Sequence, residues 1–268
     1  MRVVSCVPSL TEWLVDVGAN VVGRTRFCVH PAPAVAQIAR IGGTKQVHQD
    51  RILDLKPDLI VANREENVRG QIEDLARSCP VLVTDISSVE TAWTEMQRVA
   101  DAVECGTAGR EWIDRIREAW GEPRPVRGRA VYAVWARPWM VAGGDTYISD
   151  VMRWWGWENA YAGMSRYPEV QPGMTWEACD AVLLPSEPYP FGPREAEEVR
   201  RTGGRPLLVD GEAFSWYGSR MWHVRACLGQ GGSREGVSGA GGGAGHGRGA
   251  GSASHPAPWQ RSCGRDGG

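Results

Sequence analysis

The sequence predicts an α/β protein made of two Rossmann-like lobes that are joined by a single long helix. Short apolar strands alternate with amphipathic helices before residue 87, and the same alternation returns after residue 125. Between these parts, residues 87–120 carry apolar side chains at helical spacing, with one break at Gly106. We therefore assign residues 1–105 to an N-terminal lobe, 106–122 to the bridging helix and 123–228 to a C-terminal lobe. Residues 229–268 form a tail rich in glycine, which we expect to be disordered.

The N-terminal lobe is predicted to begin with a buried strand over residues 2–7. A helix follows, because Ser9 and Glu12 have the spacing of a capping box, in which each side chain satisfies an amide of the first turn. Residues 21–24, 59–62 and 81–83 are further apolar runs of strand length. Asn63, Arg64, Glu65 and Glu66 come directly after one of them. Ligands of open parallel sheets bind at such carboxyl ends, so we expect this loop to face a ligand.

The helical middle of the chain is predicted to start at Ser87, which forms a second capping box with Glu90. Thr107 has the character of a cap for the next helix, and Pro123 and Pro125 close that helix. This second helix is the one that we expect to join the lobes.

The C-terminal lobe is predicted to contain strands at residues 130–135, 181–184 and 206–209, each followed by aromatic residues. These are Trp135 and Trp139, with Arg137 between them, then Tyr189 and Phe191 after Glu187, and finally Trp216 and Tyr217. Flat side chains and a guanidinium group at strand ends suit a bulky, flat ligand. Core packing is the alternative for Trp135, and residues 217–220 can instead form the cap and first turn of a last helix.

Composition excludes several other classes of protein. The formal charge of −2 gives no electrostatic reason to expect nucleic acid as a partner, and no apolar run is long enough to span a membrane. The seven cysteines show no CxxC pairing, which argues against a zinc ribbon. Met1 leads directly into the first strand without an export signal, so as given the protein is expected in the cytoplasm, or outside it if the true start lies upstream.

Cys28 and His30 are the candidate metal ligands, because a thiolate and an imidazole in one loop suit a soft or borderline metal ion. The alternative is a half-buried cysteine and a histidine on a turn. The sequence lacks a GxSxG motif, and its few histidines are dispersed, so we expect no enzyme.

Seven segments, in this order along the chain, resemble the helical-backbone metal receptors, which are the cobalamin- and ferric-siderophore-type solute-binding proteins of ABC importers. They are residues 3–12 (VVSCVPSLTE), 22–31 (VGRTRFCVHP), 41–45 (IGGTK), 55–63 (LKPDLIVAN), 141–148 (VAGGDTYI), 186–191 (SEPYPF) and 209–220 (VDGEAFSWYGSR). The resemblance covers residues 1–228. It implies the class III periplasmic-binding-protein-like fold, with the ligand held between the lobes and little closure on binding.

The resemblance also implies a partner and a cargo. In cobalamin-binding members, one acidic residue on each lobe docks on arginines of an ABC permease. Here Arg69 and Ser215 occupy the expected positions, with Glu65, Glu66 and Glu212 close by as candidate docking residues. The expected ligand is a small-molecule metal chelate, a corrinoid such as cobalamin first, or a ferric siderophore or heme. We expect a monomer without an intrinsic cofactor.

The candidate ligand-binding residues are Pro8, Cys28, His30, Lys45, Asn63, Arg64, Trp135, Arg137, Trp139, Glu187, Tyr189, Phe191, Trp216 and Tyr217. Two other functions stay open at this point. One is a cytoplasmic metal-dependent enzyme or metal-trafficking factor that uses Cys28, His30 and Glu187, and the other is an inactive remnant.

Overall fold

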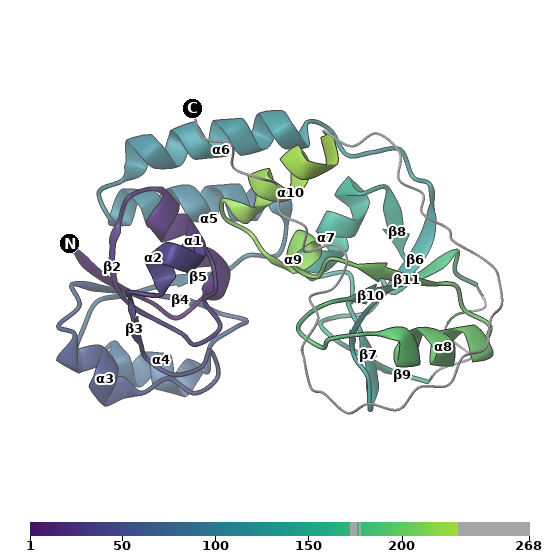
Figure 1. The fold of residues 1–268 in the computed structure, drawn as a ribbon, viewed down its shortest axis with the longest axis horizontal. Coiled ribbons are helices and arrows are strands. Elements are labelled where there is room, and N and C mark those ends of the chain that lie inside the picture. The colour runs from purple at the N-terminus through teal and green to yellow at the C-terminus, as the bar shows by residue number, and fades with distance from the viewer. Residues whose placement is uncertain (172–175, 177, 230–268) are drawn as a thin grey trace, which may run out of the picture.

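The computed structural model describes residues 1–171, 176 and 178–229, which form two α/β lobes beneath a pair of long helices (Figure 1). This arrangement confirms the predicted fold class. The glycine-rich segment 230–268, for which we predicted disorder, lies outside the described residues.

The N-terminal lobe contains one fully parallel sheet of five strands in the order β3-β2-β1-β4-β5. Strand β4 is buried along its whole length and apolar except for Asn63, and in β1 only Arg2 is exposed, as expected where helices cover both faces of a parallel sheet. The elements of this lobe are β1 (Arg2–Ser5), α1 (Pro8–Asp16), β2 (Asn20–Arg24), α2 (Ala32–Val35), β3 (Ala39–Arg40), α3 (Gln49–Asp54), β4 (Leu59–Asn63), α4 (Arg69–Leu75) and β5 (Val81–Thr84).

The C-terminal lobe contains a mixed sheet in the order β11-β10-β6-β7-β9, with β8 also paired to β6. Strand β7 is antiparallel to β6 and β9, whereas β8, β10 and β11 run parallel in their pairings. The elements are β6 (Gly128–Trp135), β7 (Trp139–Val141), α7 (Tyr147–Trp154), β8 (Trp157–Asn159), β9 (Glu169–Val170), β10 (Ala181–Pro185), α8 (Pro193–Arg201), β11 (Pro206–Val209), α9 (Glu212–Ser215) and α10 (Arg220–Gly229).

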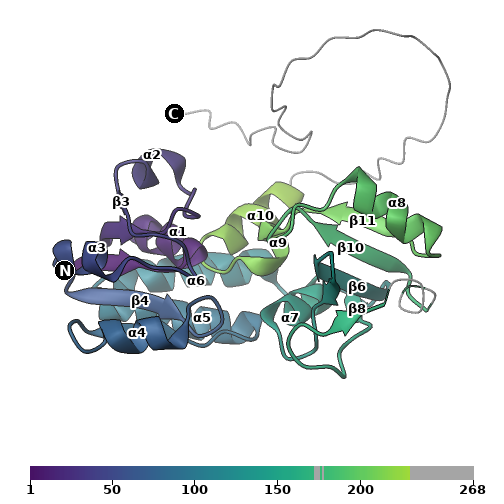
Figure 2. The ribbon, with the colours of Figure 1, turned by 90° about the horizontal axis from the view of Figure 1, so that it is seen from below.

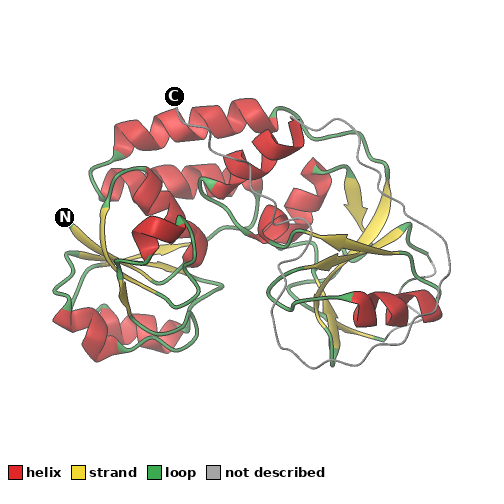
Figure 3. Cartoon of the chain, viewed as in Figure 1, coloured by secondary structure: helices red, strands yellow, loops and turns green. Residues whose placement is uncertain are grey.

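Two helices, α5 (Val89–Ala102) and α6 (Gly106–Trp120), pack along one another on one side of the molecule (Figure 3). The chain returns from the C-terminal lobe through α10, which packs on α6 and α1 at the centre of the molecule (Figures 1 and 2). Both lobes are therefore attached to the same helical layer.

The predicted helix caps were wrong in detail. Helix α5 is capped by Ser88, which accepts from the amide of Thr91 at 3.0 Å, so the capping box starts one residue after Ser87. Cys105 rather than Thr107 precedes α6. In the first helix Val7 is the cap and Pro8 takes the first turn, where its missing N–H costs nothing. Glu12 is thereby freed for a tertiary contact.

A tryptophan cluster connects the helical layer to the C-terminal lobe. The ring of Trp154 in α7 lies 5.7 Å from that of Trp93 and 5.5 Å from that of Trp120, in edge-to-face geometry. Asp150 of α7 also accepts from the amide of Val89, the first residue of α5, at 2.8 Å. One continuous hydrophobic core therefore runs through both lobes. Within the described part of the chain, no helix is long and apolar enough to cross a membrane.

Candidate ligand-binding site

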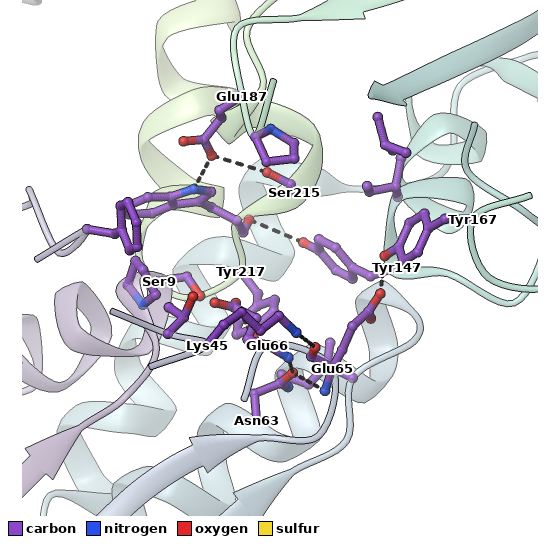
Figure 4. A pocket seen from close by; sticks show the side chains of 18 of the residues that line it. Ser9, Lys45, Asn63, Glu65, Glu66, Tyr147, Tyr167, Glu187, Ser215 and Tyr217 are labelled. Atoms are coloured by element: carbon purple, nitrogen blue, oxygen red, sulfur yellow. Dashed lines mark hydrogen bonds between the residues drawn. The ribbon is translucent and has the colours of Figure 1, made fainter. Parts of the chain in front are cut away.

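A cavity of about 800 Å³ lies between the lobes, at the carboxyl ends of β1, β2, β4, β6 and β10 (Figure 4). Its position follows from the topology, because the loops that leave parallel strands gather at one edge of each sheet. The lining residues from the N-terminal lobe are Pro8, Ser9, Arg26, Phe27, Val29, Thr44, Lys45, Asn63, Glu65, Glu66 and Ile86. Those from the rest of the chain are Val134, Trp135, Met140, Tyr147, Ile148, Tyr167, Glu187, Pro188, Ser215, Trp216 and Tyr217.

The loop after β4 is held by two buried asparagines. Asn63 Oδ1 accepts from the amides of Glu65 and Glu66, at 2.8 and 3.1 Å, and its Nδ2 donates to Thr84 Oγ1 at 3.0 Å. Asn67 Nδ2 donates to the carbonyl oxygen of Cys6 at 3.1 Å, which ties the loop to the end of β1. These bonds fix the backbone that presents both glutamates to the cavity.

Two of the cavity's carboxyl groups titrate well above the usual range of a glutamate. Burial raises the pKa of Glu66 to about 7, although its Oε1 accepts from the Tyr217 hydroxyl at 3.3 Å. Burial and the charge of Glu212 raise the pKa of Glu187 to about 7, although it accepts from the Trp216 indole and from Ser215 Oγ at 3.3 Å. Near neutral pH each group is therefore divided between its two protonation states and can accept or donate a hydrogen bond.

Tyr167 and Glu65 form a direct contact between the lobes at the cavity. The Tyr167 hydroxyl donates to Glu65 Oε1, and Arg166 Nη1 lies 3.9 Å from the other carboxylate oxygen (Figure 4). Lys45 Nζ donates to the backbone carbonyl of Glu65 at 2.7 Å, which holds the base of the same side chain. Burial and the Glu65 charge both raise the pKa of the Tyr167 phenol, so it remains protonated and donates.

Large apolar side chains of both lobes stay exposed in the cavity. Phe27 of the N-terminal lobe is 48% exposed and Trp135 of the C-terminal lobe is 44% exposed. The Trp135 ring rests edge-on against Tyr189, 5.2 Å between centroids, which fixes its orientation. Exposed rings facing the same hollow offer flat apolar area without a large ordering cost.

A network of polar side chains joins the lobes beside the cavity. His30 Nε2 lies 3.1 Å from Glu212 Oε1, and Arg220 Nε lies 3.4 Å from the other oxygen of Glu212. Arg220 also makes a two-point contact with Glu12 of α1, at 2.6 and 3.1 Å. Burial opposes ionisation of Glu212, but the hydrogen bond with His30 and the charge of Arg220 leave its pKa lowered.

Nine of the predicted site residues line the cavity. They are Pro8, Lys45, Asn63, Trp135, Glu187, Trp216 and Tyr217, together with Glu65 and Glu66, which we had expected to dock on a permease. In the structure Glu65, Glu66 and Glu212 contact Tyr167, Tyr217 and His30 between the lobes, and their role in docking stays a prediction.

Cys28 and His30, the predicted metal ligands, contact different partners. Cys28 is 1% exposed, and its Sγ lies 3.0 Å from Thr11 Oγ1 and 3.2 Å from Thr25 Oγ1. Burial raises the pKa of this thiol, which disfavours the thiolate that a metal requires. His30 turns to Glu212 instead, with its ring 5.7 Å from that of Trp216. In the part of the chain that the structure describes, no group of three metal-ligating side chains includes either residue.

Five more predicted residues lie outside the cavity lining. Arg64 points to Asp85 at 2.6 Å, and Arg137 pairs with Glu195 and the Tyr189 hydroxyl. Trp139 and Phe191 stack on each other in the core beneath α8, with 5.6 Å between ring centroids. Tyr189 contacts the ring of Trp135. The hairpin between β6 and β7 explains the difference, since it sends Trp135 and Trp139 to different sides of the lobe.

Several cavity residues were missed from the sequence. Ser9 follows Pro8, which was predicted and does line the cavity, and Phe27 precedes Cys28, which was predicted in its place. Tyr147 opens helix α7, and Tyr167 lies in the loop between β8 and β9. Neither has a sequence pattern that distinguishes it from a core tyrosine.

Comparisons with known proteins agree with this geometry. The vitamin B12-binding protein of Yersinia pestis (strain Pestoides F) is 26% identical over 180 residues, and the match spans 63% of this chain and 63% of that protein. Two solved structures from Vibrio cholerae share the fold. The vitamin B12-binding protein BtuF has a TM-score of 0.66 at 17% identity, covering 85% of this chain and 94% of BtuF. The heme-binding protein HutB has a TM-score of 0.69 at 17% identity, covering 86% of this chain and 98% of HutB. Residues 3–173 match the periplasmic binding protein family, so the chain belongs to that family.

Proposed function

We propose that this protein is a solute-binding protein that holds a flat metal chelate, a corrinoid first, in the cavity between its lobes and delivers it to an ABC importer. One observation carries the proposal: Phe27 and Trp135 come from opposite lobes and stay about half exposed in the same cavity. An apolar hollow of this size with a few polar groups is typical of a small-molecule site.

The polar lining favours a corrinoid among the flat chelates. Glu65, Glu66 and Glu187 bring three carboxyl groups into the cavity, against the two cationic side chains of Arg26 and Lys45. A corrin ring is bordered by amide groups, whose N–H groups can donate to carboxyl oxygens. Heme carries two propionates, and these would have to lie in the same acidic cavity. The relative named as a vitamin B12-binding protein supports the same order.

Membership of the family also supports proposals about the protein's location, cargo and partner. The description of the family as periplasmic supports a place outside the cytoplasm, with the chelate as cargo rather than as a cofactor. We propose that the protein acts as a monomer, that an ABC permease is its partner and that it performs no catalysis. Cys28 does not favour the alternative of a metal-dependent enzyme or trafficking factor, because its thiol is buried between two threonines.

Isothermal titration with cyanocobalamin, heme and a ferric siderophore tests this proposal. We expect one-to-one binding of cyanocobalamin at micromolar affinity or better, about −8 kcal/mol or stronger. Trp135→Ala should weaken binding about tenfold or more, because the exposed ring is lost, whereas Trp135→Phe keeps a flat ring and should weaken it less. A folded protein that binds none of the three chelates would overturn the proposal. Tight binding of heme or the siderophore alone would keep the cavity and replace the ligand.

A further inference from the structure

A second cluster of ligating side chains lies away from the cavity, where α1 meets α10. Glu12 and Asp16 are four residues apart on α1 and so share one face of that helix, and His223 faces them from α10. Each offers one ligand atom, and these atoms all lie within 4.8 Å of one another. Among the described residues this is the one group of three such side chains. We propose that Glu12, Asp16 and His223 bind a divalent transition-metal ion, such as Zn²⁺, that fastens α10 to the N-terminal lobe.

Asp16 gives an independent reason to expect a cation here. Its Oδ2 is buried and has no hydrogen-bond donor among the described residues. A carboxylate oxygen without a donor is costly when it is removed from water, and a bound cation would offset that cost. The backbone carbonyl of Asp16 accepts from the Trp112 indole at 3.3 Å, so the helix turn that carries this side chain is fixed.

The chemistry of the three ligands fits this class of ion. Two carboxylates and an imidazole form a mixed oxygen and nitrogen set, which zinc and its neighbours bind at about 2.0–2.2 Å. A tetrahedral ion would bring the ligand atoms to about 3.3 Å from one another, so small side-chain rotations close the site. The fourth position would be left to water.

The surroundings of His223 would orient it as a ligand. Its ring lies 5.3 Å from that of Trp222 and 6.2 Å from that of Trp112. Arg115 covers both tryptophans, with its guanidinium carbon 4.6 and 4.8 Å from their ring centroids. These ring contacts restrict the orientation of the imidazole.

Arg220 is the feature that opposes a cation, because it already bonds both oxygens of Glu12. An ionised carboxylate has about four lone-pair directions, and the guanidinium fork uses two of them. The remaining directions can serve the metal, so Glu12 would bridge Arg220 and the ion. We therefore expect moderate affinity rather than the tight binding of a closed structural zinc site.

Zinc binding to the full-length chain, after treatment with a chelator and in a reducing buffer, tests the proposal by titration calorimetry. Asp16→Asn and His223→Gln each remove one ligand at almost constant shape. His246→Ala combined with His255→Ala is the matched control, since it removes the two histidines beyond residue 229. We expect one Zn²⁺ with a Kd of about 10 µM or lower. Each site variant should weaken it about tenfold or more, and the control should not.

Thermal unfolding provides a second readout. Zinc should raise the Tm of the wild-type protein and of the control variant, because an ion that binds only the folded state stabilises it, and should do so much less in the two site variants. The proposal is overturned if the wild-type protein binds no zinc. It is equally overturned if Asp16→Asn and His223→Gln bind zinc as the wild type does, or if the control alone loses binding, because the ion would then lie elsewhere.

Discussion

Tyr217 donates from its phenol to the buried carboxyl group of Glu66 at 3.3 Å, and this bond joins the segment before α10 to the loop after β4. Both side chains line the cavity, although they are 151 residues apart in the chain. A cavity residue from each half of the sequence thus depends on the other for its hydrogen bond. Because the pKa of Glu66 is about 7, its protonation links the cavity to the stability of the fold.

Glu66→Gln should change how stability depends on pH. The pKa of Glu66 is raised from about 4.5 to about 7, so the folded state holds this proton more tightly than the unfolded state. The stabilisation is complete below about pH 4.5 and is lost as the pH rises through 7. Glutamine imitates the protonated group at every pH. Between pH 5 and pH 8 the wild type should therefore lose about 2 kcal/mol of unfolding free energy that Glu66→Gln keeps.

Urea unfolding at several pH values measures this difference. Glu73→Gln serves as control, because Glu73 is exposed and pairs with Arg69 on the surface of α4. Its stability should differ from the wild type by the same small amount at each pH. A constant difference between Glu66→Gln and the wild type across this range would show that Glu66 is not perturbed by burial.

Arg220→Ala should strongly destabilise the fold. Glu12 is 3% exposed, so removal of the guanidinium leaves a buried carboxylate without its partner, at a cost of about 3–5 kcal/mol. Adding Glu12→Leu to this variant should recover part of the loss. The surface pair of Arg69 and Glu73 is the matched control, and Arg69→Ala should cost about 0.5 kcal/mol or less. Denaturant titrations with a metal chelator present compare the four proteins, and equal losses for the two arginine variants would contradict the buried-pair account.

Trp120→Ala should cost about 3–5 kcal/mol of unfolding free energy, because its ring is 2% exposed and connects α6 to α7. The variant also loses the hydrogen bond from the indole to the Met221 carbonyl, 2.9 Å long. Trp135→Ala removes the same kind of side chain from the cavity and should cost under about 1 kcal/mol. Thermal and urea unfolding of both variants test the contrast. Similar losses would mean that the tryptophan cluster does not hold the lobes to the helical layer.

Gly109→Ala should destabilise the contact between α5 and α6. A Cβ atom at this position would lie 2.5 Å from the Cβ of Ala100, so the helices must move apart, at about 1–3 kcal/mol. Gly70 in α4 provides the comparison, since a Cβ there meets nothing within 4 Å. Gly70→Ala should be neutral or stabilise by up to about 1 kcal/mol, because alanine favours the helix. A stable Gly109→Ala protein would show that the helices can separate freely.

The fold class could be predicted because periodicity reports which face of each element is buried. Strand β4 and helix α6 have unbroken patterns, and the order of elements then restricts the topology. Local caps were less certain. Ser87 and Ser88 are both suitable caps, and the difference of one residue depends on the reciprocal bonds between Ser88 and Thr91 and on Asp150 from the other lobe.

The cavity could be predicted by its loops but not by its individual side chains. Trp135 and Trp139 both follow a strand, and only the β6–β7 hairpin decides which of them faces the cavity. Cys28 looked like a metal ligand because its partners, Thr11 and Thr25, are distant or featureless in the sequence. Contacts such as Tyr167 with Glu65, between residues 102 positions apart, have no local signal.

Hydrogen–deuterium exchange with and without the bound chelate tests the central claim, a site shared by the two lobes. We expect slower exchange at residues 63–67 in the N-terminal lobe and at 134–140 and 215–217 in the rest of the chain, with α8 unchanged. Protection in both lobes at once would agree with a chelate held between them. Protection confined to one lobe, or centred on α8, would contradict this account.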